Sequence, residues 1–326
     1  MITSVALYEG SGHDPHYNLA VEQYLLESVA EGQCILYLWQ NQNTVVIGRN
    51  QNPWKECRTA LLQEEGGKLA RRLSGGGAVF HDFGNLNFTF LMPQCDYNLD
   101  RQLNVIQQAV LSLGIPTERS GRNDILAAGR KFSGNAFYKN GRQAYHHGTL
   151  LVDVDKEKMG RYLNPSKAKL QSKGVDSVRS RVVNLKELNP HITVEALKKA
   201  LTEAFSQVYN CPLSIINEAD LDLRQIAGLT LRNRSWEWNF GQKLPFTFEL
   251  EERFPWGSIQ VQLLVESGII KNAKVYSDAM DDALIPYWEQ KLTGCRLDRP
   301  SLEVALNRQE LTQEQDLLQC LLQNCV

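Results

Sequence analysis

Apolar residues follow two spacings along this chain, and each spacing predicts a different kind of element. Apolar residues three or four positions apart predict helices that begin at Asp14-Pro15, at Asn52-Pro53, near Asp100, at Thr193, around 220–233 and at Thr312. Short apolar runs and alternating positions predict strands at 35–39, 44–47, 69–73, 78–80, 86–91, 131–138, 146–151, 259–265 and 269–276. The polar run Gln242-Lys243-Leu244-Pro245 predicts a boundary between a domain of residues 1–243 and a smaller domain of residues 244–326.

The ends of these elements carry recognisable signals. Asp14 and Asp100 are candidate helix caps, and Gly114 and the Gly66-Gly67 pair are candidate helix ends. Asn140-Gly141 predicts a tight turn between two strands. The run Thr312-Gln313-Glu314-Gln315 fits a capping box for a last helix.

Composition and charge narrow the function classes. A length of 326 residues suggests two domains, and a net charge of −2 argues against general nucleic-acid binding. No apolar run approaches the length of a membrane span, and the N-terminus shows no secretory signal. Seven scattered cysteines without a CxxC pair predict reduced thiols, with neither a disulfide framework nor a zinc cluster. We therefore expect a cytoplasmic protein with no membrane and no nucleic-acid partner.

The segment 156–186 differs from the rest in charge. Nine lysines and arginines face only Glu157 and Asp176, so its net charge is +7. We interpret most of these side chains as a solvated basic face. Their excess positive charge could steer an acidic partner protein toward this chain. Arg179 and Arg181 differ, because they lie in an alternating run with no amphipathic helix around it.

Two glycine-containing motifs carry the candidate chemistry. Arg71 and Arg72 precede Ser74 and the triplet Gly75-Gly76-Gly77, which Ala78, Val79 and Phe80 follow. Consecutive glycines let an anion approach the main chain, and arginine suits bidentate recognition of carboxylate or phosphate. The alternative is a flexible hairpin tip. In the second motif, 129–134, Lys131 stands beside Phe132 and small residues, so it could be drawn into a site rather than decorate a surface.

An ordered set of motifs resembles lipoate–protein ligase A, a bacterial family. The matching segments are 44–49, 51–56, 71–85, 120–124, 129–134, 146–149, 177–181 and 235–241. The resemblance is strong over residues 1–245 and weak beyond. It implies an α+β fold, with a large biotinyl/lipoyl protein ligase-like catalytic domain of mixed β-sheets and flanking helices. A small α+β C-terminal domain would follow.

The resemblance also implies an activity. Free lipoate would be activated with ATP and Mg²⁺ to lipoyl-AMP, with octanoate as a possible second acid. The lipoyl group would then pass to a lysine of lipoyl domains, in E2 subunits of 2-oxoacid dehydrogenases or in the glycine cleavage H protein. Lys131 would be catalytic, as an electrostatic clamp on the carboxylate and the α-phosphate.

Further site residues follow from the same motifs. Arg72 with the run Ser74 to Phe80 would hold ATP and the lipoate carboxyl, and Val79 would line an apolar tunnel. Asn123 and Asp124 would meet the nucleotide, with Asp124 a candidate Mg²⁺ ligand. The remaining candidates are Gly134 in the Lys131 motif, His147, Gly148 and Thr149 at the acyl end, and Arg179 and Arg181 at the adenylate. Tyr138 stands where some family members carry arginine, and 173–183 would close over the adenylate.

Other readings remain open from the residues alone. An ATP-independent lipoyl or octanoyl transferase can use the same fold, but it often needs a cysteine in the pocket, and the cysteines here lie outside both motifs. A module that binds lipoate without catalysis is a third reading. Trp236 and Trp238 are expected to pack in a core or between domains rather than stack on a ligand. His146-His147 does not predict a metal site, because adjacent strand residues face opposite ways.

Overall fold

A computed structural model describes residues 1–121, 124–164, 182–241, 246–308 and 310–325. Contacts between Cα atoms divide the chain into two compact units. The first comprises Met1–Ile47, Trp54–Arg72 and Ala78–Asn239, and the second comprises Gly48–Pro53, Leu73–Gly77 and Phe240–Val326. Each unit is described separately. No helix in the described part of the chain is both long and apolar enough to cross a membrane.

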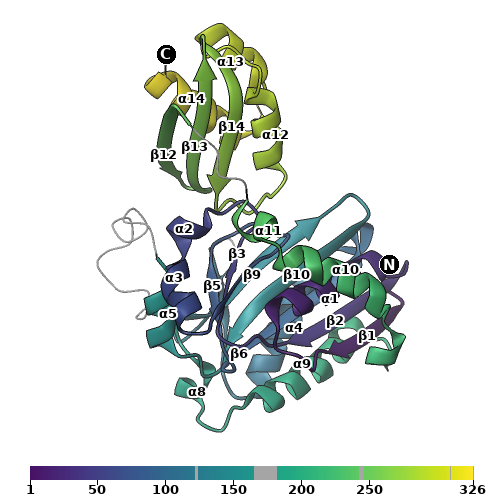
Figure 1. The fold of residues 1–326 in the computed structure, drawn as a ribbon. Coiled ribbons are helices and arrows are strands. Elements are labelled where there is room, and N and C mark those ends of the chain that lie inside the picture. The colour runs from purple at the N-terminus through teal and green to yellow at the C-terminus, as the bar shows by residue number, and fades with distance from the viewer. Residues whose placement is uncertain (122–123, 165–181, 242–245, 309, 326) are drawn as a thin grey trace. The chain divides into compact units, whose positions relative to one another are not determined.

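An eight-stranded mixed sheet forms the centre of the first unit (Figure 1). Its order is β11-β1-β2-β6-β10-β9-β8-β7. The strands are β1 (Ser4–Glu9), β2 (Gln33–Trp39), β6 (Asn85–Pro93), β7 (Glu118–Ser120), β8 (Asp124–Ala127), β9 (Arg130–Lys139), β10 (Gln143–Leu151) and β11 (Leu213–Ile215). β1 pairs parallel with β2 and β11, and the β2-β6-β10-β9-β8-β7 pairs are antiparallel. The α+β expectation is confirmed.

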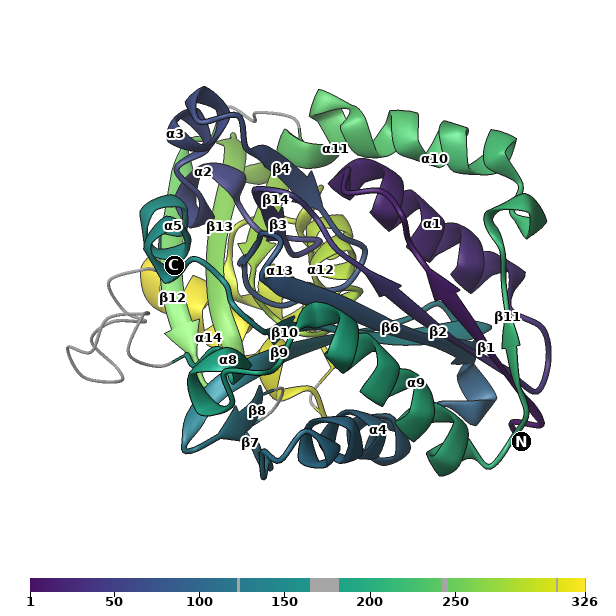
Figure 2. The same ribbon diagram turned by 90° about the horizontal axis from the view of Figure 1, so that it is seen from below.

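Helices cover both faces of this sheet, as Figure 2 shows. On one side lie α4 (Leu99–Ser112) and α9 (Val194–Tyr209), and on the other α1 (Pro15–Ser28) and α10 (Leu223–Arg234). The core under α4 and α9 contains Phe88, Phe90 and Phe205, all fully buried. Because side chains alternate along β6, the residues between these phenylalanines face the other side, toward α1.

A second sheet of three strands carries the first motif. Its order is β4-β3-β5, from β3 (Thr44–Ile47), β4 (Lys68–Arg71) and β5 (Val79–His81). Short helices α2 (Pro53–Glu56), α3 (Thr59–Glu64) and α5 (Lys156–Tyr162) accompany it, with a small core that includes Val45, Phe80 and Tyr162. Two further short helices, α8 (Leu185–Leu188) and α11 (Trp236–Phe240), complete the unit.

Local signals predicted most ends correctly. Asp14 accepts from the N–H of His16 at 3.0 Å, and Thr193 accepts from the N–H of Ala196 at 3.1 Å, so both cap their helices. Asn140 accepts from the N–H of Gln143 at 2.8 Å in the predicted turn between β9 and β10.

Two predictions about helices of the first unit were wrong. Asn98, not Asp100, caps α4, because its side chain accepts from the N–H of Arg101 at 3.0 Å. The helix expected from 52 to 66 is broken into α2 and α3, with Cys57 between them bridging to Leu163.

The second unit has its own sheet and core. Strands β12 (Phe248–Phe254), β13 (Gly257–Glu266) and β14 (Ile269–Ser277) pair antiparallel, and α12 (Leu284–Leu292), α13 (Arg299–Ala305) and α14 (Thr312–Cys325) bury Trp288 and Leu321 against them. The turn at Ser267-Gly268, with φ of 51° and 76°, confirms the predicted strand pair. The capping box was wrong, since Thr312 is itself helical. The Glu314 carboxylate instead accepts from Trp288 Nε1 and from the N–H of Arg308.

Candidate active site

Lys131 lies at the start of β9 with its side chain over Gly134. The ammonium nitrogen is 2.7 Å from Asp124 Oδ1, and the two side chains are 32% and 33% exposed. A Cβ at position 134 would lie 2.9 Å from Lys131 Nζ, so glycine there leaves room for the lysine. The N–H of Gly134 donates to Thr149 Oγ1 on β10 at 3.3 Å. Four candidates, Asp124, Lys131, Gly134 and Thr149, are therefore neighbours.

Arg72 follows β4 and is 6% exposed. Its N–H donates to the carbonyl of Ile47 at 3.1 Å, and its guanidinium donates to the carbonyl of Val46 at 3.3 Å. Burial lowers the pKa of Arg72 to about 10, so the side chain keeps its charge at neutral pH. Its neighbour Arg71 has a structural role, because its guanidinium donates to the carbonyl groups of Trp238 and Asn239.

His147 belongs to a buried polar network on the α1 side of the sheet. Its Nδ1 lies 2.8 Å from Glu22 Oε1, and Thr89 Oγ1 donates to the same oxygen at 2.7 Å. Trp39 Nε1 donates to Thr89 Oγ1 at 3.1 Å. All four side chains are at least nine-tenths buried. Helix α1 and strands β2, β6 and β10 thus each supply one member, although the residues span 125 positions in the sequence.

The side chains of strand β5 point alternately to its two faces. Phe80 is 1% exposed and packs on Tyr162 in the small core, so its side chain is not free to meet a ligand. Val79 and His81 share the opposite face, and Ala78 precedes them half-buried. His81 Nδ1 lies 3.1 Å from Asn41 Nδ2. Burial, with Arg72 and His147 nearby, lowers the pKa of His81 to about 3, so the ring is neutral.

Gly148 and His146 face the opposite side of β10 from His147. A Cβ at Gly148 would lie 2.6 Å from the carbonyl oxygen of Gly134 and 2.7 Å from Phe88, which gives this glycine a packing role. The imidazole of His146 contacts Gln102 and Asn135, and burial lowers its pKa. The two histidines face opposite ways as predicted, and the described residues contain no cluster of three metal-ligating side chains.

The glycine loop belongs to the second unit. Gly76 has φ of +87°, and its N–H donates to the carbonyl of Ala279 at 3.0 Å. A Cβ at Gly75 would lie 2.3 Å from that carbonyl oxygen, so these glycines allow close approach of another main-chain segment, and the expected approach of an anion stays a prediction. Ser74 is buried, and its carbonyl accepts from the N–H of Arg49. The candidates Ser74, Gly75, Gly76 and Gly77 are thus in one unit, and the others that the structure describes are in the first.

Three candidates, Asn123, Arg179 and Arg181, lie outside the described residues, as does most of the segment 173–183. Val182 is described, and it bridges to Lys131. Tyr138 stacks on Tyr145 with ring centroids 5.3 Å apart. Trp238 donates to the carbonyl of Arg71 at 2.9 Å, whereas Trp236 is 51% exposed and so is not a core residue.

Sequence reasoning missed Glu22, Trp39, Asn41, His81 and Thr89. One signal was present for Glu22, a charged residue between apolar positions of the buried face of α1. Another was present for His81, which shares its face of β5 with the candidate Val79. The other three have no local signal, because their partners are distant in the sequence.

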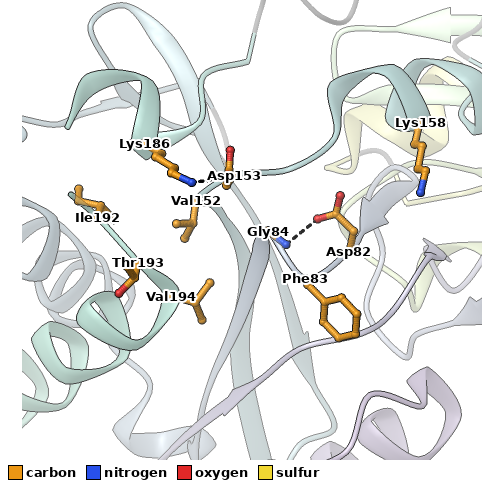
Figure 3. Close-up of a pocket in the computed structure, with 10 residues that line it drawn as sticks. All are labelled: Asp82, Phe83, Gly84, Val152, Asp153, Lys158, Lys186, Ile192, Thr193 and Val194. Atoms are coloured by element: carbon orange, nitrogen blue, oxygen red, sulfur yellow. Dashed lines mark hydrogen bonds and ion pairs between the residues drawn. The ribbon is translucent and has the colours of Figure 1, made fainter. Parts of the chain in front are cut away.

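A surface hollow of about 540 Å³ lies elsewhere in the first unit (Figure 3). It is lined by Asp82, Phe83, Gly84, Val152, Asp153, Lys158, Lys186, Ile192, Thr193 and Val194. Three of its four charged side chains have partners within the lining, since Asp82 accepts from the N–H of Gly84 and Asp153 pairs with Lys186 at 2.6 Å. None of the candidate residues lines this hollow.

Comparisons with known proteins identify the family of this chain. Residues 14–206 match the family model of the lipoyl protein ligase A/B catalytic domain, and residues 243–320 match that of the bacterial lipoate protein ligase C-terminus. The crystal structure of P. falciparum LipL1 in complex with lipoate is 27% identical. It has a TM-score of 0.86 and covers 99% of this chain and 100% of its own.

Two other solved structures share the fold at lower identity. A lipoate–protein ligase A bound with ATP is 24% identical with a TM-score of 0.63, covering 74% of this chain and 99% of its own. The bipartite lipoate protein ligase of Thermoplasma acidophilum, studied with its E2 lipoyl domain, is 24% identical with a TM-score of 0.65. That match covers 76% of this chain and 100% of the archaeal one. The chain therefore belongs to the lipoate–protein ligase family, and it is a ligase that contains both the catalytic domain and the C-terminal domain of that family.

Proposed function

We propose that this ligase activates free lipoate with ATP and then transfers the lipoyl group to an acceptor protein. The observation that carries the proposal is the position of Lys131. Its ammonium lies over a glycine, one-third exposed, with Asp124 as its counter-ion. A cation that is partly shielded and reachable by a ligand is suited to stabilise charge that develops on phosphate or carboxylate.

The first step joins two anions. A carboxylate oxygen of lipoate attacks the α-phosphorus of ATP, the bond to the β-phosphate oxygen breaks, and pyrophosphate leaves with the electron pair. Lys131 and Arg72 offset the repulsion between the carboxylate and the α-phosphate. Two unit charges 4 Å apart interact by about 4 kcal/mol at an effective dielectric near 20, against about 1 kcal/mol in water. Burial of Arg72 and partial burial of Lys131 therefore make both cations effective.

Asp124 fits a role toward Mg²⁺. The ion commonly binds one or two protein carboxylates together with substrate phosphates, so a single acidic side chain is enough. Asp124 Oδ1 is buried, and the described residues give it no hydrogen bond beside its ion pair with Lys131. Mg²⁺ held there would neutralise phosphate charge, and its arrival would release Lys131 from its counter-ion.

In the second step the ε-amine of an acceptor lysine attacks the acyl carbonyl and AMP leaves, which forms an amide. We propose lipoyl domains of E2 subunits and the H protein as acceptors. The T. acidophilum ligase was studied with an E2 lipoyl domain, which supports the first of these. Octanoate is proposed as a second acid, because Arg72 and Lys131 would recognise the carboxylate that it shares with lipoate.

The family matches at 14–206 and 243–320 support a domain boundary near 243, with catalysis assigned to the larger domain. A cytoplasmic location is proposed because scattered cysteines without a CxxC pair favour reduced thiols, which are typical of that compartment.

Exchange of labelled pyrophosphate into ATP tests the proposal. Lipoate-dependent exchange with Mg²⁺ and no acceptor protein is expected, since it reports reversible adenylate formation alone. If the folded enzyme showed no exchange but transferred octanoate or lipoate from a carrier protein, the ATP-independent transferase would replace this proposal.

A further inference from the structure

His81 carries a buried hydrogen-bonding atom that is left without a partner in the part of the chain that the structure describes. The residue is 3% exposed, and its Nε2 has no hydrogen-bond partner among the described residues. A buried polar group without a partner costs free energy comparable to a lost hydrogen bond, so such an atom calls for an explanation. The question is whether Nε2 presents a proton or a lone pair.

A chain of buried side chains answers it. The amide of Asn18 faces the carbonyl oxygens of Gly12 and Gln40 at 3.1 and 2.9 Å, and two acceptors require that this atom be nitrogen. The same Nδ2 lies 3.0 Å from Asn41. An amide nitrogen cannot accept a hydrogen bond, so the facing atom of Asn41 is its oxygen, which shares one of the two hydrogens with a carbonyl in a bifurcated bond. Asn18 and Asn41 are both fully buried, so no water competes for these bonds.

The orientation of the Asn41 amide determines which ring nitrogen of His81 carries the proton. With its oxygen toward Asn18, Asn41 presents its NH₂ group to His81 Nδ1 at 3.1 Å. Nδ1 must accept that hydrogen bond, so it carries no proton. The ring is neutral, because burial and the positive charge of Arg72 lower its pKa to about 3. The one ring proton is therefore on Nε2, as assigned from the network rather than observed.

The surroundings of the ring indicate what Nε2–H meets. His81 lies edge-on to Trp39, with ring centroids 6.1 Å apart and an interplanar angle of 75°. Arg72 and His147 are close enough to lower its pKa. These neighbours belong to the candidate active site, on the face of β5 that also carries Val79. We propose that His81 Nε2–H is a substrate-binding donor, fixed in this tautomer by the relay from Asn18 through Asn41, and that it donates to the acyl substrate.

This inference rests on the proposed function for the identity of the substrate. The partner atom must accept a hydrogen bond, and lipoate offers two such groups, its carboxylate and its ring sulfurs. Asn41 is then a positioning residue, since it acts only through His81. Its isosteric change Asn41→Asp would place a carboxylate against Nδ1 and draw the proton there.

Nitrogen-15 NMR of histidine-labelled, ligand-free protein tests the tautomer. We expect protonated Nε2 and unprotonated Nδ1 for His81 from pH 5 to 9, and a proton on Nδ1 in Asn41→Asp. A proton on Nδ1 in the wild type would overturn the relay. His146 is an internal control, because both of its ring nitrogens have partners within the protein. Asn233→Asp is the matched variant, an equally buried asparagine whose amide donates to the carbonyl of His16.

Dissociation constants for lipoate and octanoate test the donor. His81→Phe should weaken lipoate binding, by about 10- to 100-fold if the partner is an ionised oxygen and by a few-fold if it is sulfur. His81→Gln keeps an N–H near Nε2 and should recover much of the loss. Equal losses for both acids identify the carboxylate, and a loss for lipoate alone identifies the ring. Unchanged affinity for both acids in folded His81→Phe would overturn the inference. If the wild type bound neither acid, the proposed function would fail instead, while the tautomer measurement would be unaffected.

Discussion

Replacing Lys131 with methionine separates electrostatic catalysis from stability. Methionine keeps the length and apolar stem of lysine but removes the charge that we place against the α-phosphate. Removing one preorganised charge-stabilising group typically costs about 10²- to 10³-fold in rate, or about 3–4 kcal/mol. This agrees with the roughly 4 kcal/mol expected for two charges at 4 Å and an intermediate dielectric. We expect adenylate formation to fall by that factor.

The fold should tolerate this change. Lys131 and Asp124 are each about one-third exposed, and ion pairs at such positions contribute at most about 1 kcal/mol. The free energy of unfolding of Lys131→Met should therefore stay within about 1 kcal/mol of the wild type. Lys199→Met is the matched control, because its side chain is 81% exposed and its ion pair among the described residues is with Glu203 in the same helix.

Single-turnover formation of labelled lipoyl-AMP measures the rate directly, and urea unfolding measures the stability. Gly134→Ala adds a second perturbation, since its Cβ would lie 2.9 Å from Lys131 Nζ and displace the ammonium. Gly134→Ala should slow adenylate formation although residue 131 is still a lysine. An adenylation rate in folded Lys131→Met within a few-fold of the wild type would refute the role assigned to this charge.

Three further predictions concern stability. Gly148→Ala should destabilise the protein by about 1–3 kcal/mol, since its Cβ would lie 2.7 Å from Phe88. Gly228→Ala has open space around it in α10 and should stabilise the protein by about 0.5–1 kcal/mol. Thermal melts of the two variants compare these effects. Glu22→Gln should lower the free energy of unfolding by about 1–2 kcal/mol in urea, because two hydrogen bonds to a buried carboxylate become bonds to a neutral amide. Burial raises the pKa of Asp282 to about 6, so the folded state holds this proton more tightly and loses stability as the pH rises from about 4 to 6. Asp282→Asn should therefore gain about 1 kcal/mol at pH 8 and little at pH 3.5, allowing for partial exposure; an equal gain at both pH values would contradict this assignment.

Local chemistry explains what the sequence could predict. The caps at Asp14 and Thr193 and the turn at Asn140-Gly141 depend on residues within three positions of each other, so the pattern alone identified them. The Asp100 prediction failed for a related reason. Asn98 and Asp100 can both accept from main-chain N–H groups, and only the backbone geometry at Asn98 decides between them.

Long-range pairing explains what the sequence could not predict. Strands 35–39 and 44–47 are adjacent in the chain, yet they belong to different sheets, and no local signal separates them. The contact between Glu22 and His147 joins residues 125 positions apart, so His147 was identified from its motif and its partner was missed. His81 was missed because its importance lies in a relay through Asn41, which only the folded chain assembles.

The central claim is that adenylate formation is a separate first step of this ligase. The most direct measurement is exchange of labelled pyrophosphate into ATP by the purified enzyme with Mg²⁺, with and without lipoate, in the absence of any acceptor protein. Exchange that depends on lipoate and is lost in Lys131→Met is the expected result. Exchange that is absent in the wild type, or that persists at full rate without lipoate, would contradict the account.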